Sequence, residues 1–152
     1  MRSKVVTKEE ALKAFKDGQT IMFGDWHGEL SAEEIITGML EIGVKDIDAI
    51  AVSGGMPDQG VGRLIKEHRV RSLKTTHIAF NPLAKEQMFA GELDIEFVPQ
   101  GTFAERIRCG GAGLGGCLTS SVTRTGKTTS GVEASPIRSH GAPNTLTALY
   151  AW

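Results

Sequence analysis

Segments with the pattern of strands alternate with segments with the pattern of helices through the first 110 or so residues, and this alternation constrains the fold most strongly. Such alternation is typical of βαβ units, in which parallel strands are connected by helices that cover the sheet. We therefore predict an α/β fold with an open, mainly parallel sheet and flanking helices. The strand-like segments are Thr20–Phe23, Ile47–Val52, 72–80 and 94–99, and the helix-like segments lie near 8–15, 32–42, 61–70, 83–93 and 103–109.

Three short motifs predict where helices begin. Thr7–Glu10, Ser31–Glu34 and Thr102–Glu105 each have a hydroxyl residue followed three positions later by glutamate. This spacing is typical of a capping box, in which the hydroxyl accepts a hydrogen bond from a free amide of the first helical turn. Gly43 is placed to end the second of these helices.

Three loops follow predicted strands and lead into predicted helices, at residues 24–30, 53–60 and 99–101. In open parallel sheets, ligands bind in loops at the carboxyl ends of the strands. We therefore expect the functional residues in these three loops.

Composition and charge exclude several classes of function. The chain has 152 residues, which fits one domain with a real core, and its formal net charge of −1 gives no reason to expect binding to nucleic acid or to an anionic membrane. No window approaches the 18 or so apolar residues of a membrane-spanning helix. The N-terminus carries charges where a signal peptide has its apolar segment, so export is not expected. Two cysteines, Cys109 and Cys117, cannot form the disulfide framework of a small secreted domain. We expect a cytoplasmic protein.

The composition changes after Gly116. In residues 117–152, 12 of 36 residues are Ser or Thr, and Glu133 is the only acidic residue. We predict two regions: an incomplete α/β domain over 1–116, and a Ser/Thr-rich tail over 117–152 that is poorly ordered or translated out of frame.

Two segments partly match nucleotide-binding motifs but lack features that these motifs require. Residues 111–116 fit G-x-G-x-x-G, but a helix precedes them where the dinucleotide motif requires a strand. Residues 126–128 resemble the end of a P-loop, but Ser121 stands where its first glycine belongs. Neither motif indicates a bound nucleotide.

The segment FGDWHGEL, residues 23–30, admits three interpretations. Asp25, His27 and Glu29 fit a metal site, an acid–base cluster, or only a turn between a strand and a helix. No second cluster supplies further ligands, so we predict no metal site. His77 fits a half-buried histidine of a strand, and Cys109 fits a small buried residue with no base nearby in sequence.

Gln100 follows the last predicted strand and lies just before a predicted helix. Its side-chain amide is placed to donate a hydrogen bond to a developing oxyanion beside the helix N-terminus. The alternative is a loop glutamine that faces solvent.

The chain resembles the α subunit of the family I coenzyme A transferases, which act on acetate or 3-oxoacids. The resemblance is carried by Asp17–Gly24 and above all by FAGELDIEFVPQGTFAERIRCGGAG, residues 89–113, and it extends over about residues 4–118.

That resemblance implies a ping-pong exchange of coenzyme A (CoA) between carboxylic acids. CoA is then a substrate and no cofactor is needed, the nucleophilic glutamate belongs to a partner β subunit, and the assembly is an α2β2 heterotetramer. By resemblance, Gln100 is the oxyanion donor. The residues implied to contact CoA are Gly24, Asp25, Trp26, His27, Gly28, Glu29 and Leu30 in the first loop, with Gly54 and Gly55 in the second.

Three departures from the family pattern are informative. The first loop, usually G-G-F followed by small residues, is bulkier and charged here, which suggests a different acyl or acid preference, or a subfamily with its own loop. Gly54 and Gly55 replace an Asn-Asn pair. After about residue 117 the family pattern is lost, which suggests a truncated or frameshifted version. The alternative function is an inactive remnant with at most the capacity to bind its partner.

Overall fold

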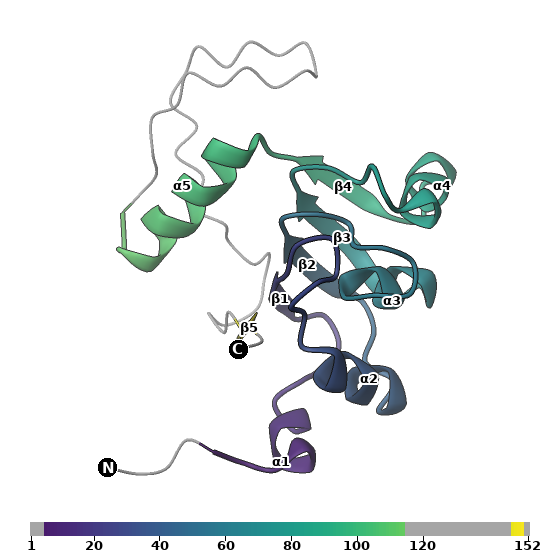
Figure 1. Ribbon diagram of the computed structural model, residues 1–152, viewed down its shortest axis with the longest axis vertical. Coiled ribbons are helices and arrows are strands. Elements are labelled where there is room, and N and C mark those ends of the chain that lie inside the picture. Colours follow the sequence, from purple (N-terminus) through teal and green to yellow (C-terminus); the bar gives the residue numbers. More distant parts are fainter. Residues whose placement is uncertain (1–4, 115–146, 151–152) are drawn as a thin grey trace.

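The computed structural model describes residues 5–114 and 147–150, and helices and strands alternate along them as the sequence predicts (Figure 1). The elements are, in order, α1 (Lys8–Leu12), β1 (Thr20–Gly24), α2 (Glu33–Glu41), β2 (Ile47–Ala51), α3 (Val61–Lys66), β3 (Val70–Thr75), α4 (Pro82–Ala90), β4 (Asp94–Phe97), α5 (Gln100–Gly111) and β5 (Thr147–Tyr150).

All strands lie in one sheet with the order β4-β3-β2-β1-β5, and every neighbouring pair is parallel. This confirms the predicted parallel α/β fold. β5 comes from the segment 117–152, where the sequence indicates no regular element, yet its backbone pairs with β1 from Thr147 to Tyr150. The rest of that segment lies outside the described residues, so the boundary at residue 116 stays a prediction.

The strand order reverses its direction at β1. From β1 to β4 each new strand is added on the same side, whereas β5 lies on the other side of β1. Because crossover connections are right-handed, such a reversal places the helices of the two halves on opposite faces of the sheet. Figure 1 shows α5 across the sheet from α3 and α4. Ligands of doubly wound folds bind where the direction reverses, which here is the carboxyl end of β1.

Side chains of the central strands alternate between two apolar clusters. Ile21 and Phe23 belong to the larger cluster, with residues of α1 to α4. Met22 and Ile50 face the other way and form a smaller cluster with Phe103 of α5. Both faces of the central strands are therefore buried, as expected for a parallel sheet.

The helix starts are only partly as predicted. Thr7 caps α1, accepting a hydrogen bond from the amide of Glu10, which confirms the first motif. The other two predictions are wrong. Ala32 precedes α2 without a side-chain cap, because the hydroxyl of Ser31 donates to Glu33 instead. α5 begins at Gln100, and Thr102 is buried within it.

The start of α3 depends on glycine at position 62. A Cβ added to Gly62 would overlap the backbone carbonyl of Met56. A Cβ added to Gly110 in α5 would meet nothing within 4 Å.

We predict that Gly62→Ala lowers the free energy of unfolding by about 3 kcal/mol, because the loop before α3 must move to make room. Gly110→Ala is the matched control and should be neutral or stabilising by up to about 1 kcal/mol, because alanine favours helix. Urea denaturation of both variants measures this. Equal stability of the two variants would contradict the described packing.

Candidate functional site at the carboxyl edge of the sheet

The loop after β1 folds back on itself in a tight turn. The amide of Trp26 donates to the carbonyl of Glu29 (3.1 Å), and the amide of Glu29 donates to the carbonyl of Trp26 (2.9 Å). Between them, His27 and Gly28 have φ values of 57° and 101°, as tight reversing turns require. Of the three interpretations of this segment, the turn between strand and helix describes its backbone.

The loop after β2 has the same construction and packs against the first. Its turn joins Met56 and Gln59, with the amide of Gln59 donating to the carbonyl of Met56 (3.1 Å). A Cβ added to Gly28 would lie 2.5 Å from the Cβ of Gln59, and one added to Gly60 would lie 2.5 Å from a carboxylate oxygen of Asp25. The two loops approach this closely because both positions lack a side chain.

Glu33, in the first turn of α2, ties these loops together. Its carboxylate accepts hydrogen bonds from the hydroxyl of Ser31 (2.6 Å), the amide of Gly60 (2.6 Å) and the guanidinium of Arg63 (2.9 Å). Burial alone would raise the pKa of Glu33, but these bonds outweigh it and lower the pKa. Glu33 is therefore ionised at neutral pH and holds the second loop against the first.

Asp25 lies between the two loops, and both of its carboxylate oxygens are shielded from solvent. Burial raises the pKa of Asp25 to about 6, although the backbone amides of Val61 and Gly28 act in the opposite direction. Neither amide reaches the carboxylate with normal hydrogen-bond geometry, so burial prevails.

The loop after β3 brings His77 to the same edge. The Nε2 atoms of His27 and His77 are 3.0 Å apart, and Thr76 Oγ1 lies 2.8 Å from His77 Nδ1. His27 also packs against Trp26 and Phe80, with ring centroids 4.6 and 4.5 Å away. We call these four rings, Trp26, His27, His77 and Phe80, the ring cluster.

Serine and threonine residues after the strands fix the backbone of these loops. Ser53 Oγ accepts from the amides of His27 and Gly55, both at 3.2 Å. Thr76 Oγ1 donates to the carbonyl of Val52 at 2.7 Å. The loops after β1, β2 and β3 thus form one hydrogen-bonded unit.

The structure places the predicted site residues at different depths. Gly24 ends β1, and Gly28 is buried against the second loop, whereas Trp26, Glu29 and Leu30 are exposed.

Gly54 and Gly55 are also buried. The carbonyl of Gly54 accepts from the side-chain amide of Asn81 (2.8 Å), and Gly55 has a φ of 65°. Whether any of the predicted residues contacts CoA stays a prediction.

Gln100 is the first residue of α5, and its side chain is exposed. It therefore belongs to the helix, not to the loop before it. It follows β4, the neighbour of β3, so Gln100 and His77 leave adjacent strands at the same edge.

Several residues of this edge were not found from the sequence. Ser53 lies in the predicted loop 53–60 but has no predicted role, and Thr76 falls inside the strand predicted at 72–80, which ends at Thr75 in the structure. Glu33 looks like an ordinary exposed residue of a helix. The pairing of His27 with His77 joins positions 50 residues apart, and no spacing in one sequence indicates it.

Within residues 5–114, no three His, Cys, Asp or Glu side chains come together in a way that would hold a metal ion. Cys109 of α5 is fully buried, as its sequence context predicts. The helices in this part of the chain include none long and apolar enough to cross a membrane.

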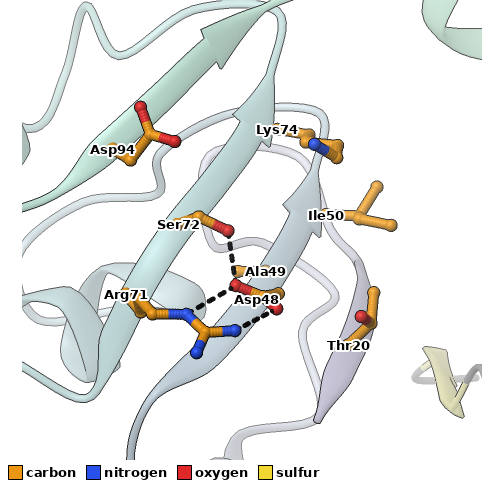
Figure 2. Close-up of a pocket in the computed structure, with 8 residues that line it drawn as sticks. All are labelled: Thr20, Asp48, Ala49, Ile50, Arg71, Ser72, Lys74 and Asp94. Atoms are coloured by element: carbon orange, nitrogen blue, oxygen red, sulfur yellow. Dashed lines mark hydrogen bonds and ion pairs between the residues drawn. The ribbon is translucent and has the colours of Figure 1, made fainter. Parts of the chain in front are cut away.

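A polar hollow of about 360 Å³ lies elsewhere on the sheet (Figure 2). Its centre is Asp48, which accepts from Arg71 (2.6 Å) and from Ser72 (2.6 Å). Burial alone would raise the pKa of Asp48, but these bonds lower it. The residues that line the hollow belong to the strands themselves, from Thr20 and Asp94 at strand starts to Lys74 near the end of β3, so it lies along a face of the sheet and not in the loops after the strands. Because the charge of Asp48 is already paired there, we place the functional site at the carboxyl edge.

The fold and this edge define a doubly wound α/β protein with its functional loops after the parallel strands. Comparison with known proteins then gives the family: the family model of coenzyme A transferase matches residues 5–145. The chain belongs to the coenzyme A transferase family.

The curated relatives that it matches include α subunits. It is 44% identical over 119 residues to the acetate CoA-transferase subunit alpha of Escherichia coli (strain K12), covering 78% of this chain and 54% of that protein. It is 46% identical over 116 residues to the probable coenzyme A transferase subunit alpha of Bacillus subtilis (strain 168), covering 76% and 51%. The chain therefore spans about half the length of these relatives.

Solved structures agree with the fold. The glutaconate coenzyme A-transferase of Acidaminococcus fermentans matches with a TM-score of 0.66 at 18% identity, covering 82% of this chain and 40% of that one. An acyl-CoA transferase of E. coli O157:H7, in a thioester complex with CoA, matches with a TM-score of 0.64 at 21% identity, covering 74% and 23%. At these identities the likeness supports the fold alone.

We predict that ionisation of Asp25 lowers the free energy of unfolding. Because burial raises the folded pKa of Asp25 to about 6, above the ordinary aspartate value of 3.8, folding favours the protonated form, and the stability that this form contributes is lost as pH rises through 6. Wild-type protein should therefore lose about 1 kcal/mol relative to Asp25→Asn between pH 5 and pH 8, after allowance for solvent screening. Chemical denaturation across this range measures the difference. Parallel stability curves would contradict the raised pKa.

Proposed function

We propose that this chain is the α subunit of a two-subunit CoA-transferase. The enzyme moves CoA between a short-chain acyl-CoA or 3-oxoacyl-CoA and a carboxylic acid such as acetate. CoA is a substrate, and the reaction uses no bound cofactor. The observation that carries the proposal is the identity of 44–46% to CoA-transferase α subunits, together with a family match over residues 5–145, which include the loops of this edge and Gln100.

The printed names of the relatives support the class of substrate. One further relative, 38% identical over 119 residues, is the acetoacetyl-CoA:acetate/butyrate CoA transferase alpha subunit of Clostridium acetobutylicum. Its name gives short-chain acids and a 3-oxoacyl-CoA as substrates. The same class is proposed here, with the bulkier loop 24–30 adjusting the preference among acids.

The proposed mechanism divides the chemistry between two chains. A glutamate of the β subunit attacks the acyl-CoA thioester, which forms a mixed anhydride and expels the CoA thiolate. The thiolate attacks the glutamyl carbonyl of the anhydride, which releases the first acid as a carboxylate and leaves an enzyme–CoA thioester. The second carboxylate attacks this thioester, and the expelled thiolate then attacks the acyl carbonyl of the new anhydride, which gives the new acyl-CoA and frees the glutamate. The present chain stabilises the negative charge that develops in the transition state. The Gln100 side-chain amide is exposed at the N-terminus of α5, where it can donate to the oxyanion that forms as the thioester carbonyl is attacked.

A β partner is implied by the names of the relatives as alpha subunits. We propose an α2β2 assembly that works in the cytoplasm. The three loops at the carboxyl edge would face the β subunit across the substrate.

We predict that Gln100→Ala lowers kcat for CoA exchange by about 10²- to 10³-fold in the complex with the β subunit, because one oxyanion donor is lost. Glu105→Gln is the matched control on the same helix; Glu105 pairs with Arg108 at the surface, and activity should be unchanged. Acetyl-CoA formation from acetate and a short-chain acyl-CoA measures both. Full activity of Gln100→Ala would remove this residue from the mechanism.

A further inference from the structure

The ring cluster takes no part in the mechanism above, yet it lies at the same edge. Trp26 and His27 come from the loop after β1, and His77 and Phe80 from the loop after β3. The His27 and His77 rings are perpendicular, with centroids 5.2 Å apart, and Trp26 and Phe80 are each 53% exposed. A solute at this edge can therefore reach the cluster.

The hydrogen bonds fix the protonation pattern of the pair. Thr76 Oγ1 donates its one hydrogen to the carbonyl of Val52, so it accepts from His77 Nδ1. His77 then keeps a lone pair on Nε2, and this lone pair accepts the Nε2 hydrogen of His27 at 3.0 Å. The pKa of His77 is lowered, first by burial and then by the neighbouring His27. His77 thus remains the neutral acceptor of the pair.

Two aromatic rings and one hydrogen-bond acceptor surround the ring of His27. Trp26 and Phe80 both pack against it, and aromatic faces attract a cation. His77 accepts the hydrogen of His27 Nε2, and a charged donor strengthens such a bond. The carboxylate of Asp25 is close enough for the charge of His27 to lower the pKa of Asp25. A proton taken up by His27 is placed on Nδ1, because Nε2 already holds the hydrogen shared with His77.

We propose that the His27–His77 pair binds the carboxylate group of the acid that receives CoA. In this proposal His27, protonated on Nδ1, donates a hydrogen bond to the carboxylate. His77 accepts the Nε2 hydrogen of His27 and so orients its ring, while Trp26 and Phe80 form the apolar surroundings. This inference rests on the proposed function and adds to it the residues that recognise the acid. No covalent step is involved, and the proton comes from solvent.

The other groups around His27 agree with binding of an anion. Its own loop contributes Asp25, whose pKa burial raises to about 6, so the charge of this carboxyl opposes an anion less at pH 6 than at pH 8. The loop after β2 contributes the neutral hydroxyl of Ser53, which accepts from the amide of His27. The loop after β3 contributes neutral His77 and the neutral hydroxyl of Thr76. The carboxylate of Glu33 is occupied by Ser31, Gly60 and Arg63.

Because binding takes up a proton, affinity for the acid should depend on pH. It should weaken by up to about tenfold per pH unit, because one proton is taken up with each acid bound. The 152-residue chain is titrated with butyrate at pH 6 and pH 8, while the ring nitrogens of its histidines are followed by ¹H–¹⁵N NMR. The His27 and His77 signals should shift and saturate, with tighter binding at pH 6. His27→Gln and His77→Gln should lose saturation, whereas His68→Gln, an exposed control near Glu92, should retain it.

The result that overturns the inference is an absence of saturable shifts at His27 and His77 at pH 6 in folded protein, with folding checked by circular dichroism. Equal affinity at both pH values, or saturation that survives in a folded His27→Gln variant, would overturn it as well.

Steady-state kinetics with the β subunit separates this inference from the proposed function. His27→Gln should raise KM for the acid at least about tenfold, as expected for a lost charged hydrogen bond, with KM for acyl-CoA and kcat nearly unchanged. A rise in KM for acyl-CoA alone would assign the cluster to CoA and overturn the inference while the proposed function stands. Absence of CoA exchange in the wild-type complex would reject the proposed function, and butyrate binding by NMR would still report on the pair.

Discussion

The close packing of the loop after β1 against the loop after β2 is the constraint on which the rest of this edge depends. Gly28 and Gly60 meet where any side chain would collide with Gln59 or Asp25. The carboxylate of Glu33 then joins α2 to the amide of Gly60. If the loops separated, the carboxylate of Asp25 would become exposed to solvent, and the amide of His27 would lose its hydrogen bond to Ser53 Oγ.

The construction of these loops explains why they form a rigid edge. The turns at Trp26–Glu29 and Met56–Gln59 both close by backbone hydrogen bonds, so neither depends on a ligand for its shape. The loop after β3 is joined to them through Thr76 and through Asn81, which donates to the carbonyl of Gly54. Groups held in this way need little reorganisation when a substrate binds.

α5 completes the edge from the opposite face of the sheet. Phe103 packs it against Met22 and Ile50, while the salt bridge between Arg106 and Glu96 joins it to β4. Burial alone would raise the pKa of Glu96, but the bonds from Lys74 and Arg106 lower it. The position of Gln100 therefore follows from packing on one face, and the positions of the loops follow from packing on the other.

Much of this fold follows from local sequence signals, and much of the site does not. Alternation of strand and helix patterns predicts the parallel sheet, and Thr7 caps α1 because its bond reaches only three residues along the chain. Ser31 does not act as such a cap, since its hydroxyl is bound to Glu33, whose carboxylate also reaches across the sheet edge to Gly60.

The sequence predicts three loops at this edge, and the structure packs two of them, 24–30 and 53–60, against each other. Gln100 and Gly101 of the third belong to α5, and the loop that is joined to the first two is the one after β3. The contacts that give them chemistry could not be predicted from one sequence, because they join residues far apart in the chain. His27 meets His77 only after two strands and two helices have been formed between them. The raised pKa of Asp25 likewise depends on burial by the second loop.

The central claim is that the loops after the parallel strands, with the start of α5, form the α-subunit side of a CoA-transfer site. Hydrogen–deuterium exchange of the complex with the β subunit, with and without a short-chain acyl-CoA, tests it most directly. We expect acyl-CoA to slow exchange at residues 24–30, 53–60 and 99–103, and to leave the strand residues around Asp48 unchanged. Slower exchange confined to the hollow at Asp48, or no change in the three loops, would contradict the account.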